Sequence, residues 1–412
     1  MKKIVLLVTL LVISLSVGLV QAAPAAQEAG GEAYTVQAGD WLSKLAEKYY
    51  GDIMAYPTIV EATNAKAGED DSFTVIDNPD LIEPGQQLWI PATAERMLKV
   101  AAEVSVTDIA LAGPITDRNA ELSGMAWYGD YLILLPQYPN FATEEGDGFI
   151  FAIPKADLVA FLDGAGGEPL EPMQIPFVAP GLQESLTGFE GYEAIAFVGQ
   201  NDVFLTIETE TDDGMLGYLV AGSIESDLSA LTVDTTTMLE IQPQSGVGNM
   251  SEESLLVAGD TLLTIYEANG VAVNASPVAH VSDMALAAAG TIAFPSVEYR
   301  ITDVTALDGN DRFWAINYFF PGDSDLLPLT DPIANQHGEG PTHIPNPGVE
   351  RLIELQYSPD GITLTGAAPI QMELLAEDLR NWEGLVRLDD RGFLVATDKY
   401  PQTILSFVPA GE

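Results

Sequence analysis

Acidic and amide side chains recur at matching positions in five stretches of this sequence. Each stretch has a polar residue, a short apolar segment, a tight turn rich in Asp and Gly, a second apolar segment and a second polar residue. The first polar position holds Ser123, Glu193, Glu253, Asp303 and Glu383, and the second holds Gln137, Glu208, Glu267, Asn317 and Asp398. Carboxylates that are brought together raise one another's pKa unless a cation neutralises them. The aligned positions therefore predict two polar rings that attract a cation.

The carboxylates of these rings are the candidate metal ligands. They are Glu193, Glu208, Glu253, Glu267, Asp303, Glu383 and Asp398. Hard cations take about six to eight oxygen ligands, and calcium tolerates irregular geometry better than magnesium. The absence of Cys and the presence of only 3 His disfavour transition metals. Calcium is the predicted cofactor, and the alternative is that each acid accepts hydrogen bonds from backbone amides where a strand starts.

The elements that must position these side chains are β-hairpins. Two apolar segments around a DG, GD or ND turn are typical of a hairpin. The first polar positions recur at intervals from 50 residues (253 to 303) to 80 residues (303 to 383), which is typical of a β-propeller. Both polar positions of a hairpin fall at the same end of the blade. Both rings are therefore expected at one mouth of the central channel.

Residues 105–412 are expected to form the propeller, which makes the protein mainly β. Five blades are the simplest count, and a sixth would have to lie between Asn317 and Glu383. A strand over residues 105–112 is expected to complete the last blade, because only one further strand, over residues 402–408, follows the last hairpin.

A long segment over residues 320–348 is rich in Pro, Gly and Asp. Long loops in compact domains are usually functional or disordered. Three interpretations stay open: a lid over the mouth, surface decoration, or a concealed blade. If the mouth holds a substrate, the candidate contacts are Arg351, Lys399, His337 and His343.

The N-terminus has the pattern of an export signal. Residues 1–23 contain two lysines, an apolar run and small residues, as in a secretory signal peptide. An uncleaved membrane anchor is the alternative, and it is the one route by which a membrane would become a partner. Residues 24–32 are expected to be a flexible linker, and residues 93–104 a second linker.

Residues 33–92 resemble a LysM domain. The resemblance rests on Tyr34–Val36, Gly39, Asp40, Tyr50–Asp52, Asn64, Asn78–Ile82, Pro84–Gln86, Leu88, Ile90 and Pro91. It implies a small βααβ fold that binds peptidoglycan or another N-acetylglucosamine-containing glycan. The glycan-binding residues that it implies are Gly39, Asp40, Trp41 and Leu42 on one side of a groove, and Asn78, Pro79, Asp80, Leu81 and Ile82 on the other. Trp41 has two interpretations, a sugar-stacking ring or a core residue.

Residues 105–412 resemble the phytase-like, esterase-like β-propeller family. The resemblance rests on the openings Glu193–Ile195 and Glu383–Leu385, on Ile301–Asp303 and on Glu350–Leu352. It implies a calcium-binding propeller and, if the protein is an enzyme, hydrolysis of phosphate or carboxylic esters.

The composition excludes some partners. The chain has 61 acidic and 16 basic residues, a formal net charge of −45, which repels nucleic acid and anionic lipid. We therefore expect a secreted or cell-envelope protein that binds glycan through LysM and presents the propeller as a binding or scaffold platform. The alternative is a calcium-dependent ester hydrolase. The sequence assigns no catalytic residue, and a carboxylate pair for glycosidic acid–base chemistry is conceivable without being singled out.

Overall fold

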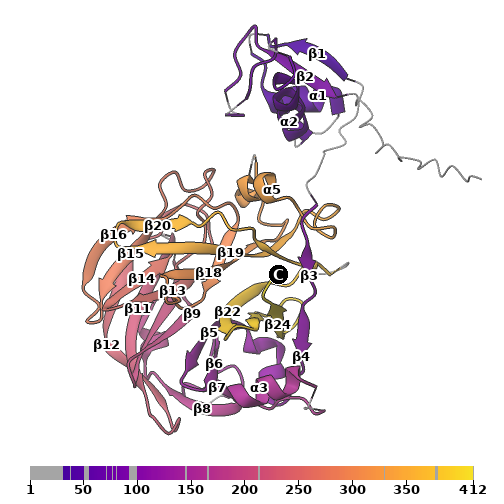
Figure 1. Cartoon of the computed structure of the whole chain (residues 1–412). Coiled ribbons are helices and arrows are strands. Elements are labelled where there is room, and N and C mark those ends of the chain that lie inside the picture. Colours follow the sequence, from indigo (N-terminus) through magenta and orange to yellow (C-terminus); the bar gives the residue numbers. More distant parts are fainter. Residues whose placement is uncertain are drawn as a thin grey trace, which may run out of the picture. The chain divides into compact units, whose positions relative to one another are not determined.

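The structure is a computed structural model that describes residues 31–37, 39–50, 55–70, 72–76, 78–79, 81–91, 100–143, 146–164, 167–211, 214–328, 330–375 and 379–411. The chain divides into two compact units, Met1–Met97 and Leu98–Glu412 (Figure 1). The predicted signal segment 1–23 and most of the linker 24–32 lie outside the described residues. Within the described ranges, no helix is long and apolar enough to cross a membrane.

The first unit has the βααβ order expected of a LysM domain. Its elements are β1 (Gly31–Thr35), α1 (Leu42–Tyr50), α2 (Tyr56–Ala67) and β2 (Gln87–Pro91), and β1 pairs antiparallel with β2. The helical spacing of Leu42, Leu45 and Ala46 places all three side chains in the core, against Ile59 of α2 and Leu88 of β2. The first strand begins at Gly31, two residues before the predicted boundary.

The second unit is a β-propeller with five blades among its described residues. The first blade contains β5 (Leu122–Tyr128), β6 (Tyr131–Pro136), β7 (Phe149–Pro154) and β8 (Met173–Val178), and the second contains β9 (Phe189–Val198), β10 (Asp202–Thr211), β11 (Gly214–Ile224) and β12 (Leu231–Ile241). The third contains β13 (Ser254–Ala258), β14 (Thr261–Ile265), β15 (Val278–Asp283) and β16 (Ala288–Ala293), and the fourth contains β17 (Arg300–Val304), β18 (Arg312–Phe319), β19 (Val349–Ser358) and β20 (Gly361–Leu364). The fifth contains β22 (Trp382–Leu388), β23 (Gly392–Thr397), β24 (Leu405–Pro409) and β4 (Thr107–Ile109).

The first strands of the blades form a closed ring around the channel. β5 contacts β9, β9 contacts β13, β13 contacts β17, β17 contacts β22, and β22 contacts β5. In Figure 1, β5, β9, β13 and β22 lie toward the middle of this unit, while β8, β12 and β16 lie toward its outside. Outer strands of neighbouring blades also join in parallel, β8 with β12 and β16 with β20. The mainly β propeller fold is confirmed, with the five blades that the five hairpins predict.

The hairpin turns explain why the sequence pattern is so regular. Positive φ angles occur at Gly129, Gly199 and Gly259 in the first three turns, and at Asp311 and Asp389 in the last two. Glycine adopts this conformation without a steric penalty, and Asp tolerates it better than most residues. The Asp- and Gly-rich turns of the sequence therefore mark the inner hairpin of every blade.

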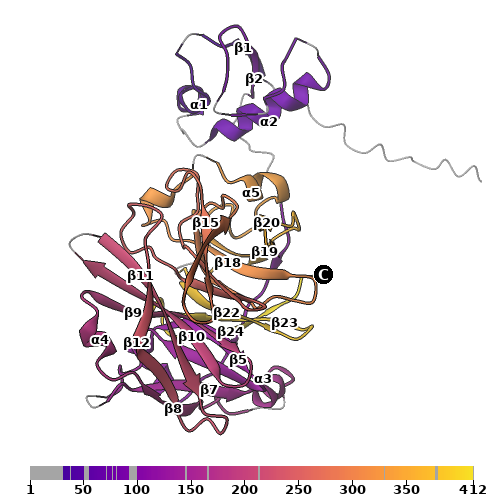
Figure 2. The same ribbon diagram turned by 90° about the vertical axis from the view of Figure 1, so that its left-hand side faces the viewer.

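An N-terminal strand completes the fifth blade, as predicted. β4 pairs antiparallel with β24, with Ile109 opposite Leu405, and Figure 2 shows the C-terminal strands β22, β23 and β24 together. The hydroxyl of Ser406 donates to Asp108 over 2.7 Å. The first and last parts of the propeller are therefore held in one sheet.

The structure corrects the predicted linker 93–104 and decides one alternative for the insert. β21 (Ile370–Met372) pairs with β19 and with β3 (Glu103–Val104). The end of the predicted linker 93–104 is therefore a strand of the propeller unit. The insert 320–348 contains no strand in its described part, only the short helices η4 (Ser324–Leu326) and α5 (Pro332–His337), so it hides no sixth blade. The other helices are η2 (Pro114–Thr116), η3 (Arg118–Ala120), α3 (Lys155–Leu162) and α4 (Leu182–Ser185).

Candidate functional sites

The corner between β1 and α1 is fixed by Asp40. Its carboxylate accepts hydrogen bonds from the hydroxyl of Tyr34 and from the backbone N–H of Gln37, both over 2.7 Å. The bond from the Gln37 backbone, followed by the bond from Tyr34, lowers the pKa of Asp40. Asp40 thus closes the strand-to-helix corner. Gly39, with φ of 91°, makes the turn possible.

The side chains of the predicted groove differ in exposure. Trp41 is 61% exposed and Leu81 is 64% exposed, while Leu42 is 3% exposed and packs in the core. The core interpretation of Trp41 is therefore wrong, and Leu42 can offer only its backbone to a ligand. Asp80, another predicted contact, lies outside the described residues, as do Gly51 and Asp52 of the LysM pattern.

The other predicted side of the groove is a turn held from α2. The backbone N–H of Leu81 donates to the carbonyl of Asn78 over 3.0 Å. Just before this turn, the side chain of Asn64 bonds both the N–H and the carbonyl of Ile76, over 2.7 and 3.1 Å. These bonds fix the segment that leads into Asn78, Pro79, Leu81 and Ile82.

A cavity of about 620 Å³ lies at the mouth of the propeller and is lined from all five blades. We call it the mouth. Its lining residues are Glu121, Gln137, Tyr138, Glu190, Glu193, Glu208, Asn249, Glu253, Arg300, Tyr318, Phe320, Asn381, Glu383, Asp398, Lys399 and Tyr400. Five of the seven predicted carboxylates, Glu193, Glu208, Glu253, Glu383 and Asp398, are thus brought together at one site.

Amide side chains hold two of these carboxylates in place. The side-chain amide of Gln137 donates to Glu193 over 3.1 Å, and that of Asn381 donates to Glu383 over 2.6 Å. The Gln137 bond joins the first blade to the second. The mouth is therefore organised by contacts between neighbouring repeats.

Arg300 is buried at the mouth, where its positive charge lies close to the carboxylates. Its guanidinium donates to Glu267, and it lies 3.9 Å from a carboxylate oxygen of Asp323, a residue of the insert. Burial opposes the charge on Arg300, but attraction by Glu267, Glu253 and Glu383 outweighs burial and raises its pKa. Glu267 does not line the mouth. It contacts the mouth indirectly, because it holds the guanidinium of Arg300.

Burial favours the protonated form of the inner acids of the mouth. Burial, followed by repulsion from neighbouring carboxylates, raises the pKa of Glu193, Glu253 and Glu383 well above the ordinary value. The same causes raise the pKa of Glu208 to about 7. The two basic residues of the lining, Arg300 and Lys399, do not balance its seven acidic residues, and the raised pKa values reduce the difference.

Two oxygen atoms at the mouth lack a donor. The Oε1 atom of Glu208 and the Oδ1 atom of Asn381 are buried, line the mouth, and have no hydrogen-bond partner among the described residues. A buried acceptor without a partner costs about 1 to 3 kcal/mol. These atoms favour a ligand that brings positive charge or hydrogen-bond donors.

Asp303 and Asn317 do not line the mouth. The carboxylate of Asp303 accepts from the backbone N–H groups of Leu385, over 2.7 Å, and Val304, over 2.8 Å. Asn317 donates to the carbonyl of Arg300 over 3.2 Å. Both side chains hold strand backbones, which is the structural alternative stated for the rings. Asp303 was predicted as a metal ligand, but its carboxylate is occupied by these backbone N–H groups.

Three of the four predicted substrate contacts are elsewhere. Arg351 is buried and bonds Asn317 and Asp331, each over 2.8 Å. His343 is buried and lies 2.9 Å from Glu103, while His337 lines a different cavity. Lys399 does line the mouth, where it bonds Glu121 over 2.9 Å. Within the described part of the insert, Phe320 lines the mouth, and Asp323 lies 3.9 Å from Arg300.

The sequence reasoning missed an aromatic rim. Tyr138, Tyr318, Phe320 and Tyr400 line the mouth together with the acids. Two of these could have been predicted from the hairpin pattern, because Tyr138 directly follows Gln137 and Tyr400 lies two residues after Asp398.

Calcium stays a prediction. In the ranges that the structure describes, no three acidic or histidine side chains converge as ligands of one metal ion. The donor set at the mouth nevertheless has the right chemistry, because it consists of carboxylate and amide oxygens. Glu193, Glu208, Glu253, Glu383 and Asp398 would supply the ligands if a cation entered.

Solved structures with a similar arrangement are glycoside hydrolases. A thermostable family-43 glycoside hydrolase has a TM-score of 0.41 and 10% identity, covering 74% of this chain and 94% of that one. An exo-β-1,3-galactanase from Phanerochaete chrysosporium has a TM-score of 0.40 and 7% identity, covering 74% and 64%. The catalytic domain of a family-62 α-L-arabinofuranosidase from Coprinopsis cinerea has a TM-score of 0.41 and 9% identity, covering 76% and 97%.

The expectation of ester hydrolysis is corrected. The similar structures are named for glycosidic activities and not for esterase or phytase activity, and no family match supports the phytase-like resemblance. The geometry gives a physical reason against a phosphate ester. Arg351 is bonded to Asp331 away from the mouth, and Arg300 is already bonded to Glu267, so little positive charge remains for a phosphate.

A curated relative matches the N-terminal part of the chain. An uncharacterized protein of Deinococcus radiodurans is 48% identical over 65 residues, which are 16% of this chain and 21% of that protein. The match thus spans about a fifth of the relative's length. The LysM domain family model matches residues 34–62. The N-terminal unit therefore contains the LysM domain that the sequence predicts.

Proposed function

We propose that this protein binds an N-acetylglucosamine-containing glycan of the cell envelope through its LysM domain, with peptidoglycan as the first candidate. The observation that carries the proposal is the match of residues 34–62 to the LysM model. The exposed side chains of Trp41 and Leu81, on the two predicted sides of the groove, support it. An exposed indole ring offers an apolar face that a sugar ring can cover.

Co-sedimentation with purified peptidoglycan tests this proposal. The protein without residues 1–23 should sediment with the glycan, and Trp41→Ala should reduce the bound fraction at least about tenfold, equivalent to about 1.4 kcal/mol. Val271→Ala is the matched control, because it removes an apolar side chain that is 65% exposed in the propeller unit. Equal sedimentation of Trp41→Ala and the control would contradict the assigned groove.

We further infer that the mouth of the propeller is a ligand site and that its ligand is a cation. The buried carboxyls with raised pKa and the unpartnered oxygens of Glu208 and Asn381 support this inference. A bound cation would replace the protons that the acids otherwise retain. In this account LysM holds the protein at the glycan, and the propeller presents the cation-binding mouth, outside the cell or at its wall.

A second candidate for the mouth is glycosidic acid–base chemistry. The pKa of about 7 for Glu208 favours it, since a carboxyl that is protonated near neutral pH can act as a general acid. Release of reducing sugars from wall polysaccharide would test it. Activity should disappear in Glu208→Gln and persist in Asp303→Asn, whose side chain is outside the mouth. A Glu208→Gln variant with unchanged release would contradict this role.

A further inference from the structure

A second cavity, of about 850 Å³, lies between the fourth and fifth blades, away from the mouth. Its walls come from β3, β18, β19, β21, β22 and β23, and from Ala410 and Gly411 near the end of the chain. We call it the interblade cavity. Its volume falls within the roughly 300 to 1,000 Å³ of small-molecule sites. Apart from His337, none of the residues predicted as a site lines it.

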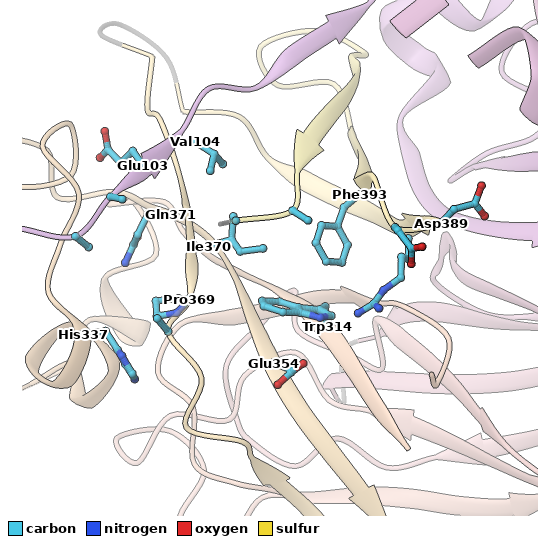
Figure 3. Close-up of a pocket in the computed structure, with 18 residues that line it drawn as sticks. Glu103, Val104, Trp314, His337, Glu354, Pro369, Ile370, Gln371, Asp389 and Phe393 are labelled. Carbon is cyan, nitrogen blue, oxygen red and sulfur yellow. The ribbon is translucent and has the colours of Figure 1, made fainter. Parts of the chain in front are cut away.

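Aromatic and aliphatic side chains form the middle of the interblade cavity. Figure 3 shows Trp314, Ile370 and Phe393 there, with Glu103 and Asp389 toward opposite ends. The rings of Trp314 and Phe393 pack on each other with centroids 5.3 Å apart. The ring of Trp314 remains partly exposed, whereas Phe393 and Ile370 are buried. The cavity therefore offers an indole surface that a ligand with apolar C–H groups can cover.

The charges around this surface are mostly compensated within the protein. Asp389 pairs with Lys155 over 2.8 Å, and Glu354 lies 3.6 Å from Arg312. Glu103 is engaged by His343. In a chain with a net charge of −45, this local balance means that the interblade cavity does not select a ligand by charge.

Hydrogen-bond donors and acceptors both lie in the lining of the cavity, together with the indole ring of Trp314. The guanidinium of Arg387 lies 5.6 Å from the ring of Phe393 and has no ion pair within the described part of the chain. Asp390, which is exposed, likewise makes no described ion pair and supplies acceptors. The amide of Gln371 donates to the carbonyl of Gly338 over 3.4 Å, which leaves its oxygen to accept. The cavity thus presents hydrogen-bond donors and acceptors next to an aromatic face.

We propose that the interblade cavity binds a neutral oligosaccharide. A sugar ring has C–H groups that cover an indole face and hydroxyl groups that both donate and accept hydrogen bonds. A purely apolar ligand would offer no hydrogen-bond partner to Arg387 or Asp390. A charged ligand would meet no excess of opposite charge. The proposal does not depend on the LysM domain, because the cavity lies wholly within the propeller unit.

Binding of neutral oligosaccharides to the full mature chain tests the proposal. The probes are short neutral hexose and pentose oligosaccharides without N-acetylglucosamine, and the protein carries Trp41→Ala so that the LysM groove does not contribute. Titration calorimetry should detect binding of at least one probe. Trp314→Ala should weaken that binding about tenfold or more, while Trp314→Phe should retain most of it. Val271→Ala is the control for loss of an apolar side chain.

Trp314 packs on Phe393, so Trp314→Ala could weaken binding by disturbing the fold. A second variant separates the two effects. Asp390→Ala removes an exposed acceptor and should weaken binding without changing the unfolding temperature. The proposal is overturned if no neutral oligosaccharide of the panel binds, or if binding is unchanged in both Trp314→Ala and Asp390→Ala. Stronger binding of acidic oligosaccharides than of neutral ones would also overturn it.

Discussion

The guanidinium of Arg300 is hydrogen-bonded to the carboxylate of Glu267 behind the acids of the propeller mouth. Both side chains are buried. Removing one partner of a buried ion pair leaves an uncompensated charge, which is more costly than the pair itself. Arg300 therefore supplies a buried counter-charge beside the ring of acids.

Arg300→Met should destabilise the protein strongly. The substitution keeps an unbranched apolar side chain of moderate size but leaves Glu267 without its counter-charge, and the expected loss is about 3 to 5 kcal/mol of the free energy of unfolding. Urea unfolding at neutral pH measures this loss. Arg312→Met is the control, because Arg312 is largely exposed and its pair with Glu354 is screened by solvent. Equal effects of the two substitutions would mean that Arg300 is not a buried counter-charge.

The free energy of unfolding should fall as the pH rises from about 4.5 to 7. The pKa of Glu208 is raised from 4.5 to about 7 in the folded state, so the folded protein binds more protons than the unfolded chain between these values. The contribution of Glu208 to the free energy of unfolding is present below its pKa in the unfolded chain. It is lost as the pH rises through its pKa in the folded protein. At about 1.4 kcal/mol per pKa unit, the loss from Glu208 alone is on the order of 3 kcal/mol.

Urea unfolding at a series of pH values checks this dependence. Glu193 and Glu383, whose pKa values are also raised, should add to the slope. Glu193→Gln should flatten the curve, because glutamine stays neutral at every pH. A free energy of unfolding that rises steadily between pH 5 and 7 would contradict the raised pKa values of these acids.

Asp303→Ala should lower stability without changing the response of the protein to cations. The carboxylate holds the backbone N–H groups of Leu385 and Val304, and a lost buried partner costs about 1 to 3 kcal/mol per group. Unfolding experiments with and without calcium measure both quantities. If calcium stabilises the native protein but not Asp303→Ala, the side chain is a ligand and its structural assignment fails.

The hairpin periodicity made the fold predictable. The positive-φ turns at Gly129, Gly199 and Gly259 follow a common pattern, because each turn must reverse a strand within two or three residues. The closing strand was also predictable, since the last hairpin leaves too little chain for a complete blade. The pairing of β21 with β3 was not, because it depends on a two-residue strand in a segment that carries no periodic signal.

The candidate site was predictable in part, and the reason lies in side-chain direction. Equivalent repeat positions placed Glu193 and Glu383 at the mouth, yet Asp303 at the same position turns to the backbone of Leu385. A periodic pattern fixes the position of a residue along its strand but not the hydrogen-bond partner that its side chain reaches. For the same reason the pairing of Arg300 with Glu267 could not be predicted from the pattern.

The most direct test of the propeller mouth is thermal unfolding of the protein without residues 1–23 at neutral pH, in chelator, in calcium and in magnesium. We expect a rise of the unfolding temperature that is specific for calcium and absent from a Glu193→Gln, Glu383→Gln double variant. Calcium at about 100 times its dissociation constant should add about 2.7 kcal/mol to the free energy of unfolding. No shift, an equal shift with magnesium, or a shift that persists in the double variant would contradict a cation site formed by these acids.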